Sequence, residues 1–236
     1  MNNLAEQFTA KRRRIYLMRH GDVRYWNNGV RVDDPDLVEL TEKGHGQARN
    51  MGEFLKDVEF DKAICTGLKR TVQTAQGVLG TRDLTLNEHP ALKEIRTGVT
   101  TEWTEQQLLD DFVFGMQKAA VPGARFANGE EFATFYDRIG AGLQPVLDDQ
   151  SWRTLLMVCH GGTNRAVMAH LTGGGLNQFG IFEQDKCCLN ILDLDMEGGK
   201  VVRAWIRLLN FHPDNVHKWD RRTSQEMILA TRYDGS

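Results

Sequence analysis

The sequence predicts an α/β fold, a three-layer sandwich in which helices flank a largely parallel central sheet. Two strongly apolar runs, residues 15–18 and 154–159, are typical of short buried strands. Residues 131–147 carry apolar side chains at the spacing of an amphipathic helix. Strands that alternate with helices along a chain favour a parallel sheet covered on both faces.

The first strand, residues 15–18, runs directly into Arg19, His20 and Gly21. We interpret the basic run before it, residues 11–14, as a solvated lead-in to the strand. Gly21 permits a tight turn of the backbone, so that the imidazole of His20 can face a cavity.

The next part of the chain is expected to form a loop and two strand–helix units. Residues 22–36 are rich in Asn, Asp, Gly and Arg, which indicates a long loop, and Thr41 then caps a helix. The other elements expected before residue 100 are strands at 63–66 and 84–86 and a helix at 69–79.

The second half opens with an irregular stretch, residues 100–130, which we interpret as a partly helical excursion over the active site. The excursion belongs to a single expected domain, residues 1–236. After the strand that ends in His160, the expected elements are a helix at about 164–171, strands at 189–194 and 201–209, and a Gly198-Gly199 turn between them. The polar chain after residue 211 receives no assignment.

Composition excludes several classes of protein. The net charge of −3 over 236 residues gives no indication of nucleic-acid or anionic-membrane binding. No apolar run approaches the 18 residues of a membrane span. The four cysteines, Cys65, Cys159, Cys187 and Cys188, show neither disulfide nor metal-ligand spacing, so we expect buried free thiols in a cytoplasmic protein.

Unusual polar residues stand at three strand-to-loop junctions. Arg19 and His20 follow the first strand, Arg70 lies in the helix after the second, and His160 follows the strand at 154–159. In a parallel sheet the carboxyl ends of the strands hold the ligand, so we expect these residues to converge. A histidine beside an arginine at such a position is typical of a nucleophile next to an anion clamp.

Five ordered segments resemble the histidine phosphatase superfamily, the phosphoglycerate-mutase-like proteins. They are residues 17–21 (Leu-Met-Arg-His-Gly), 40–44, 68–75, 92–95 and 158–162 (Val-Cys-His-Gly-Gly). The resemblance spans roughly residues 15–195. Three departures concern substrate choice. Val23 stands where the family often has Ser or Thr, and the Trp-Asn pair comes one residue late, at Trp26-Asn27. After Glu94, where many phosphatases of the family have an aromatic-Gly and then a Glu-Gly pair, residues 97–101 are Thr-Gly-Val-Thr-Thr.

The resemblance implies a hydrolase of the histidine acid phosphatase type, a phosphoric monoester hydrolase that acts on a small phosphorylated metabolite. It implies that His20, Glu94, His160, Arg19 and Arg70 are catalytic. The phosphate-binding set that it implies is Arg19, Arg70, His160, Asn27 and Gly161.

These residues suit a phosphohistidine mechanism. Arg19 and Arg70 each offer a planar fork of donors to phosphoryl oxygens. His20 would attack phosphorus with a neutral ring nitrogen, while a backbone carbonyl in the turn after Gly21 holds the other nitrogen. Glu94, protonated through burial or through the charge of the phosphate, would protonate the leaving oxygen.

Alternatives remain at several points. Asp22 and Glu88 are the other candidates for the acid, and no metal or cofactor is expected because the arginines neutralise the phosphate. A cofactor-dependent phosphoglycerate mutase and a catalytically silent binding protein are the rival functions. Arg24, Arg31, Arg96, Arg125 and Arg165 could shape an anionic substrate site, although for each we favour a solvated surface position.

Overall fold

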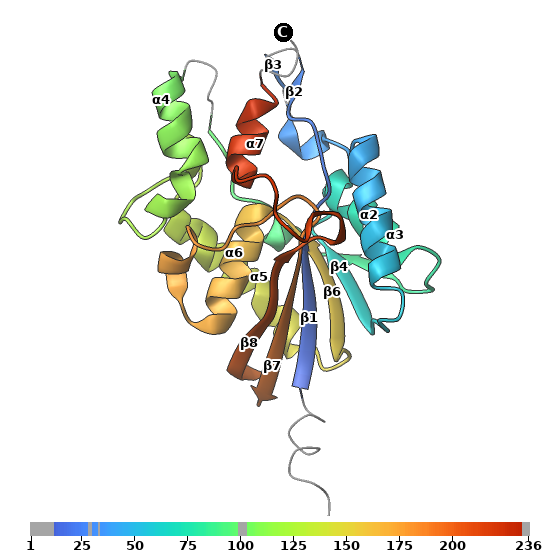
Figure 1. Ribbon diagram of the computed structural model, residues 1–236. Helices are drawn as coiled ribbons and strands as arrows, with labels where there is room; N and C mark the ends of the chain where they lie inside the picture. The colour runs from blue at the N-terminus through green and yellow to red at the C-terminus, as the bar shows by residue number, and fades with distance from the viewer. Residues whose placement is uncertain (1–11, 28–29, 33, 99–102, 233–236) are drawn as a thin grey trace, which may run out of the picture.

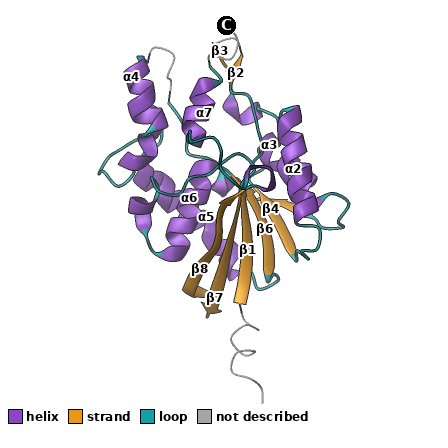
Figure 2. Cartoon of the chain, in the orientation of Figure 1, coloured by secondary structure: helices purple, strands orange, loops and turns teal. Residues whose placement is uncertain are grey.

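The computed structural model describes residues 12–27, 30–32, 34–98 and 103–232. Within them, a six-stranded sheet lies between two groups of helices, which confirms the predicted three-layer α/β class (Figures 1 and 2). The strands of this sheet are β1 (Arg12–Arg19), β4 (Lys62–Cys65), β5 (Leu86–Glu88), β6 (Thr154–Cys159), β7 (Leu189–Glu197) and β8 (Lys200–Phe211). The helices that we use below are α2 (Glu42–Phe54), α3 (Lys69–Leu79), α4 (Glu105–Gln107), α5 (Phe132–Asp148), α6 (Gly161–Thr172) and α7 (Ser224–Ala230).

The strand order is β5-β4-β6-β1-β7-β8, and the first three neighbouring pairs are parallel. β7 pairs antiparallel with β1 and with β8. In the β1–β6 pair, Arg19 stands opposite Cys159, so His20 and His160 leave the sheet at the same level. The carboxyl ends of β1, β4 and β6 therefore meet at one edge, as the parallel fold requires.

Strand β1 is apolar at consecutive positions because it is buried on both faces. Ile15 and Leu17 pack into the core beneath α5 and α6, whereas Tyr16 and Met18 pack into the core beneath α2 and α3. This alternation follows from the two-residue period of a strand. Residues 15–18 thus pack against both helical layers, which fixes the position of the residues that follow them.

Most predicted elements are confirmed, including the Thr41 cap, whose hydroxyl accepts from the backbone N–H of Gly44. All four cysteines are buried free thiols, as expected. The third strand lies two residues later than predicted, at β5. The helix expected at about 164–171 begins earlier, at Gly161, because extended His160 already serves as its N-cap.

The interpretation of residues 11–14 as a solvated lead-in is wrong for the described part of that run. Arg12 and Arg14 belong to β1 and form ion pairs with Asp195 and Asp193 of β7, at 2.8 Å and 2.6 Å. Arg13 is buried and donates to the carbonyl of Leu147 at 2.9 Å. β1 therefore begins before its apolar residues 15–18, because Asp193 and Asp195 of β7 supply carboxylates for the arginines.

Two regions contain more structure than the sequence indicated. The expected loop at 22–36 holds the short hairpin β2 (Trp26–Asn27) and β3 (Val30–Arg31). The unassigned tail contains α7, which begins in a capping box between Thr223 and Glu226. Across the described chain, no helix has both the length and the apolar character needed to cross a membrane.

Glycines allow α2 and α3 to pack closely. A Cβ at Gly52 would lie 2.8 Å from the carbonyl oxygen of Gly77, and a Cβ at Gly77 would lie 2.7 Å from Cβ of Ala48. Backbone atoms cannot move aside as the end of a flexible side chain can. The contact between these helices therefore requires glycine at position 52.

We expect Gly52→Ala to lower the free energy of unfolding by about 1–3 kcal/mol, because the helices must separate. Gly46→Ala is the matched control in the same helix, where the nearest atom, Nη2 of Arg49, would lie 4.0 Å from the new Cβ. That change should raise the free energy of unfolding by about 0.5–1 kcal/mol through helix propensity. Urea denaturation measures both, and equal effects of the two substitutions would contradict the packing argument.

Candidate active site

The imidazole of His20 is held in one orientation at the end of β1. Its Nδ1 hydrogen-bonds to the carbonyl of Gly21 at 2.9 Å, as expected for the turn after this histidine. The side chain is 2% exposed, and its ring centroid lies 5.3 Å from that of His160. With the proton of a neutral ring on Nδ1, the lone pair of Nε2 remains for chemistry.

Gly21 is required for a reason other than the one we inferred from the sequence. Its φ does not lie in the left-handed region. Instead, a Cβ at Gly21 would lie 2.8 Å from the carbonyl oxygen of Gly44 in α2. The first turn of α2 thus packs directly against the backbone that follows His20, and a side chain there would displace the nucleophile loop.

Arg19, Arg70 and His160 gather around this imidazole, as the parallel sheet predicted. Arg19 donates through Nη1 to the carbonyl of Gln184 at 2.5 Å, and Arg70 donates through Nη1 to the carbonyl of Pro35 at 2.8 Å. Nε2 of His160 lies 2.9 Å from the hydroxyl of Thr66. Arg19, Arg70 and His160 are each less than 5% exposed.

Three nitrogens of this group lack partners. Of the buried side-chain nitrogens and oxygens in the described residues, four make no hydrogen bond, and three of them are Nε of Arg19, Nε of Arg70 and Nδ1 of His160. Unsatisfied buried donors are rare and costly in folded proteins. Their concentration beside His20 indicates a site that receives an acceptor-rich anion.

The surroundings keep both histidines neutral. Burial, followed by the positive charges of Arg70 and Arg19, lowers the pKa of His20 well below its ordinary value. Burial and then the charge of Arg70 likewise lower the pKa of His160. The site therefore combines two cations with two neutral imidazoles, which suits a nucleophilic ring nitrogen and a dianionic ligand.

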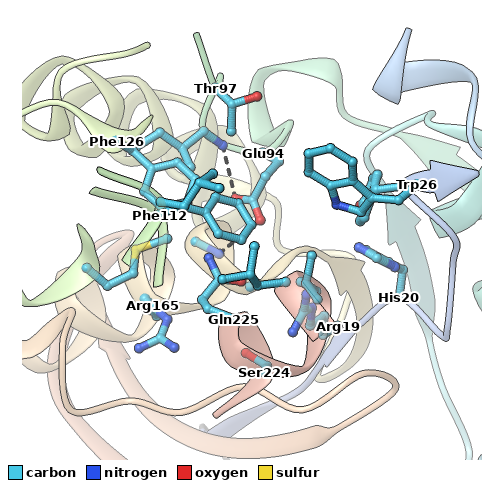
Figure 3. Close-up of a pocket in the computed structure, with 18 residues that line it drawn as sticks. Arg19, His20, Trp26, Glu94, Thr97, Phe112, Phe126, Arg165, Ser224 and Gln225 are labelled. Atoms are coloured by element: carbon cyan, nitrogen blue, oxygen red, sulfur yellow. Dashed lines mark hydrogen bonds between the residues drawn. The ribbon is translucent and has the colours of Figure 1, made fainter. Parts of the chain in front are cut away.

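The carboxyl group of Glu94 is fixed at the start of α6. It accepts hydrogen bonds from the backbone N–H groups of Gly162, at 3.0 Å, and Thr163, at 3.1 Å, as well as from its neighbour Ile95. A Cβ at Gly162 would lie 2.5 Å from Oε1 of Glu94, so a side chain there would displace the carboxyl group from this position. Glu94 and His20 line the same pocket (Figure 3).

The two other acid candidates lie elsewhere. Asp22 is engaged by Nζ of Lys186 at 2.5 Å and by the hydroxyl of Thr41 at 2.7 Å. Glu88 is exposed at the end of β5. Neither carboxylate is among the described residues that line the pocket of His20 and Glu94.

Of the two remaining residues predicted to bind phosphate, Gly161 and Asn27, the structure describes the surroundings of Gly161 alone. Gly161 lines the pocket, and a Cβ there would lie 3.5 Å from Cζ of Arg19. The side chain of Asn27 lies outside the described part of the structure, as does that of Arg31. The neighbouring Trp26 lines the pocket.

Among the arginines assigned to the surface, Arg24, Arg96 and Arg125 are exposed as favoured, but Arg165 is not. Arg165 is 3% exposed, lines the pocket and forms an ion pair with Glu183 at 3.2 Å. Its place on α6, one turn after the glycines that follow His160, explains why it faces inward rather than toward solvent.

Sequence reasoning missed the pocket residues of α7, namely Ser224, Gln225, Ile228 and Leu229. A signal for this helix was present, because Thr223 and Glu226 form a capping box ahead of an apolar run. The capping box predicts that a helix begins at this point, but it does not predict where α7 packs. α7 lies against the π-helical turn Leu108–Val113, which carries further lining residues.

Comparisons with known proteins concern the family and the fold. A family model of the histidine phosphatase superfamily (branch 1) matches residues 15–206. An adenosylcobalamin/alpha-ribazole phosphatase of Escherichia coli K12 is 27% identical over 203 residues, which cover 84% of this chain and 95% of that protein. A probable phosphoglycerate mutase of Erwinia tasmaniensis is 30% identical over 153 residues, 62% of this chain and 69% of the relative.

A solved structure gives the same result for the fold. The crystal structure of the alpha-ribazole phosphatase from Shigella flexneri superposes with a TM-score of 0.64 and 26% identity. The match covers 84% of this chain and 96% of that one.

The lowered pKa of His20 makes stability depend on pH. Below about pH 6.5, the unfolded chain binds a proton at His20 that the folded protein excludes, so acidification lowers the free energy of unfolding. We expect His20→Gln to reduce this pH dependence by about 1.4 kcal/mol per pH unit between about pH 6 and pH 5. Urea denaturation in phosphate-free buffer measures it, and an unchanged slope in the variant would contradict a neutral buried His20.

Proposed function

This chain belongs to the histidine phosphatase superfamily, and we propose that it is a metal-independent phosphomonoesterase that hydrolyses a small phosphorylated metabolite through a phosphohistidine on His20. The observation that carries the proposal is the group of three unpartnered buried nitrogens beside the ring of His20. A phosphoryl group has the acceptor oxygens and the charge that these nitrogens need. The names of the relatives, two of which are alpha-ribazole phosphatases, support hydrolysis of phosphate esters.

The first half of the reaction transfers the phosphoryl group to His20. Nε2 attacks phosphorus while Nδ1 donates to the carbonyl of Gly21, which holds the ring in the nucleophilic tautomer. The bond from phosphorus to the ester oxygen breaks, and Glu94 gives its proton to that oxygen. In the second half, water gives a proton to Glu94 and attacks phosphorus, the bond from phosphorus to Nε2 of His20 breaks, and inorganic phosphate leaves the neutral imidazole behind.

The positive charge of the site stabilises both transition states. Nε of Arg19 and Nε of Arg70 donate to the phosphoryl oxygens, and two guanidinium groups offset the charge of the dianion without a metal ion. We propose that, when substrate is bound, the hydroxyl of Thr66 donates to Nε2 of His160 and not to the hydroxyl of Thr71, 3.1 Å away, which places the proton of the imidazole on Nδ1. His160 then supplies the third hydrogen bond to the phosphoryl group.

We propose that this activity belongs to a single domain, residues 1–236, and that the excursion at 100–130, of which residues 100–102 lie outside the described structure, covers the pocket. Leu108, Phe112, Met116 and Phe126 of that stretch line it. The buried free thiols favour a reducing compartment, and we propose the cytoplasm.

The decisive experiment is a screen of phosphorylated metabolites for release of inorganic phosphate, with a chelator present throughout. The mutase alternative is supported by the relative from Erwinia tasmaniensis. It is tested by incubation with 3-phosphoglycerate and a bisphosphoglycerate primer. Isomerisation without net release of phosphate would replace the hydrolase, and absence of both reactions would favour a silent binding protein.

We expect His20→Ala to lower kcat by about 10⁴-fold or more, because no other group in the site replaces the attacking nitrogen. Brief exposure of the unaltered enzyme to a labelled ester should leave an acid-labile, base-stable phosphate on His20. Phosphopeptide mapping locates this label, and His217→Ala, at an exposed histidine, is the control that should retain both label and activity. A label on any other residue would overturn the assignment of the nucleophile.

Glu94→Gln should slow alkyl phosphates by about 10²–10⁴-fold, because their leaving oxygen needs a proton. Hydrolysis of p-nitrophenyl phosphate, whose leaving group is stable as an anion, should fall far less. Steady-state kcat values for the two esters measure the difference, and Glu88→Gln is the matched control at an exposed carboxylate. Equal slowing of both esters would remove Glu94 from the acid role.

A further inference from the structure

The pocket lined by Arg19, His20 and Glu94 extends well beyond these residues, and we call its remaining part the far chamber. Figure 3 shows His20 and Trp26 at one end of the pocket, with Phe112 and Arg165 at the other. The catalytic end is polar, whereas the far chamber is lined mainly by apolar side chains. The substrate beyond its phosphoryl group has to lie there.

Two segments from distant parts of the chain form the apolar walls. Leu108, Met116 and Phe126 are each at most 5% exposed, and the ring of Phe112 packs 5.8 Å from that of Phe126. From the opposite side, α7 contributes Ile228 and Leu229. These side chains are fixed by packing against the core or against each other, so the chamber is formed before a ligand arrives.

The charge in this chamber is already balanced. Among the described residues that line the pocket, Arg19 and Arg165 are the only arginines or lysines. Arg19 faces the phosphoryl position, and Arg165 is committed to Glu183 at 3.2 Å and to the carbonyl of Phe179 at 2.5 Å. A second anionic group on a substrate would therefore lose its hydration without gaining an unpaired cation.

Helix α7 lies beyond residue 206, where the match to the family model ends. It is attached to the site by the backbone N–H of Ser224, which donates to Glu183 at 2.9 Å. At its other end, the guanidinium of Arg232 lies 5.2 Å from the ring centroid of Trp26. The α7 side of the wall therefore comes from a part of the chain that the family model does not cover.

We propose that the substrate is a phosphomonoester whose leaving group is uncharged and largely apolar, and that this group lies between α7 and the segment Leu108 to Phe126. The inference rests on the proposed phosphatase function and specifies its substrate class. Phosphorylated carboxylic acids and bisphosphates are then poor substrates, because their second anion enters an apolar chamber of balanced charge.

The test compares esters that differ in charge but not in the reacting bond. Hexyl phosphate is paired with 6-(phosphonooxy)hexanoate, and 4-ethylphenyl phosphate is paired with 3-[4-(phosphonooxy)phenyl]propanoate. We expect kcat/KM to be about tenfold or more higher for the uncharged member of each pair. Equal or better turnover of the charged members would overturn the inference while leaving the phosphatase intact. No phosphate from any ester, p-nitrophenyl phosphate included, would instead refute the proposed function.

A pair of variants in α7 tests where the leaving group lies. Leu229→Ala should lower kcat/KM for hexyl phosphate by about three- to tenfold and leave that for ethyl phosphate nearly unchanged, because the shorter chain does not reach α7. Met227→Ala is the matched control, since Met227 lies on the same helix but lines a different cleft. Loss of hexyl phosphate turnover in both variants, or in neither, would contradict the assignment.

Glu183→Gln tests the charge balance. Glutamine can still accept from the N–H of Ser224, but it leaves the charge of Arg165 without its counter-ion. We expect kcat/KM for 6-(phosphonooxy)hexanoate to rise about tenfold relative to that for hexyl phosphate. A ratio that does not change would show that Arg165 does not set the charge preference of the chamber.

Discussion

The parallel pairing of β1 with β6 is the constraint on which the rest of the site depends. Their register sets Arg19 opposite Cys159, and the backbone N–H of His20 then donates to the carbonyl of Cys159 at 3.0 Å. Two histidines more than a hundred residues apart in sequence therefore leave the sheet side by side, with ring centroids 5.3 Å apart. A shift of one residue in this register would turn one ring to the opposite face of the sheet.

Electrostatics supply the second organising effect. Two guanidinium groups are buried beside the imidazoles, and the buried Nε of each has no partner. Such an arrangement costs stability in the free protein, since buried cations lose hydration. It favours any ligand that brings oxygen acceptors and negative charge. Burial and the positive charges of Arg70 and Arg19 also lower the pKa of His20, which keeps its ring neutral. The two arginines that attract the anion thus also preserve the nucleophile.

The pocket divides into two parts with different origins. Its catalytic end is built from strand ends and the first turns of α3 and α6, which are rigid parts of the family fold. Its far end is built from the segment Leu108 to Phe126 and from α7, which lies after the matched range. In the proposal above, the catalytic end performs the chemistry and the far end selects the leaving group.

The sequence by itself determined the layered α/β fold, because apolar periodicity is a local property of the chain. Through short motifs, which are local as well, it led to the proposed catalytic set Arg19, His20, Arg70, Glu94 and His160. It also indicated the carbonyl that holds Nδ1 of His20. It could not place Arg12–Arg14 or Arg165, since their positions depend on partners on β7 and at Glu183 that are distant in sequence. Nor could it reveal that Gly21 is needed for the approach of Gly44, or that α7 closes the pocket. Those features were decided only by tertiary packing, because docking depends on the surfaces that two distant segments present to each other.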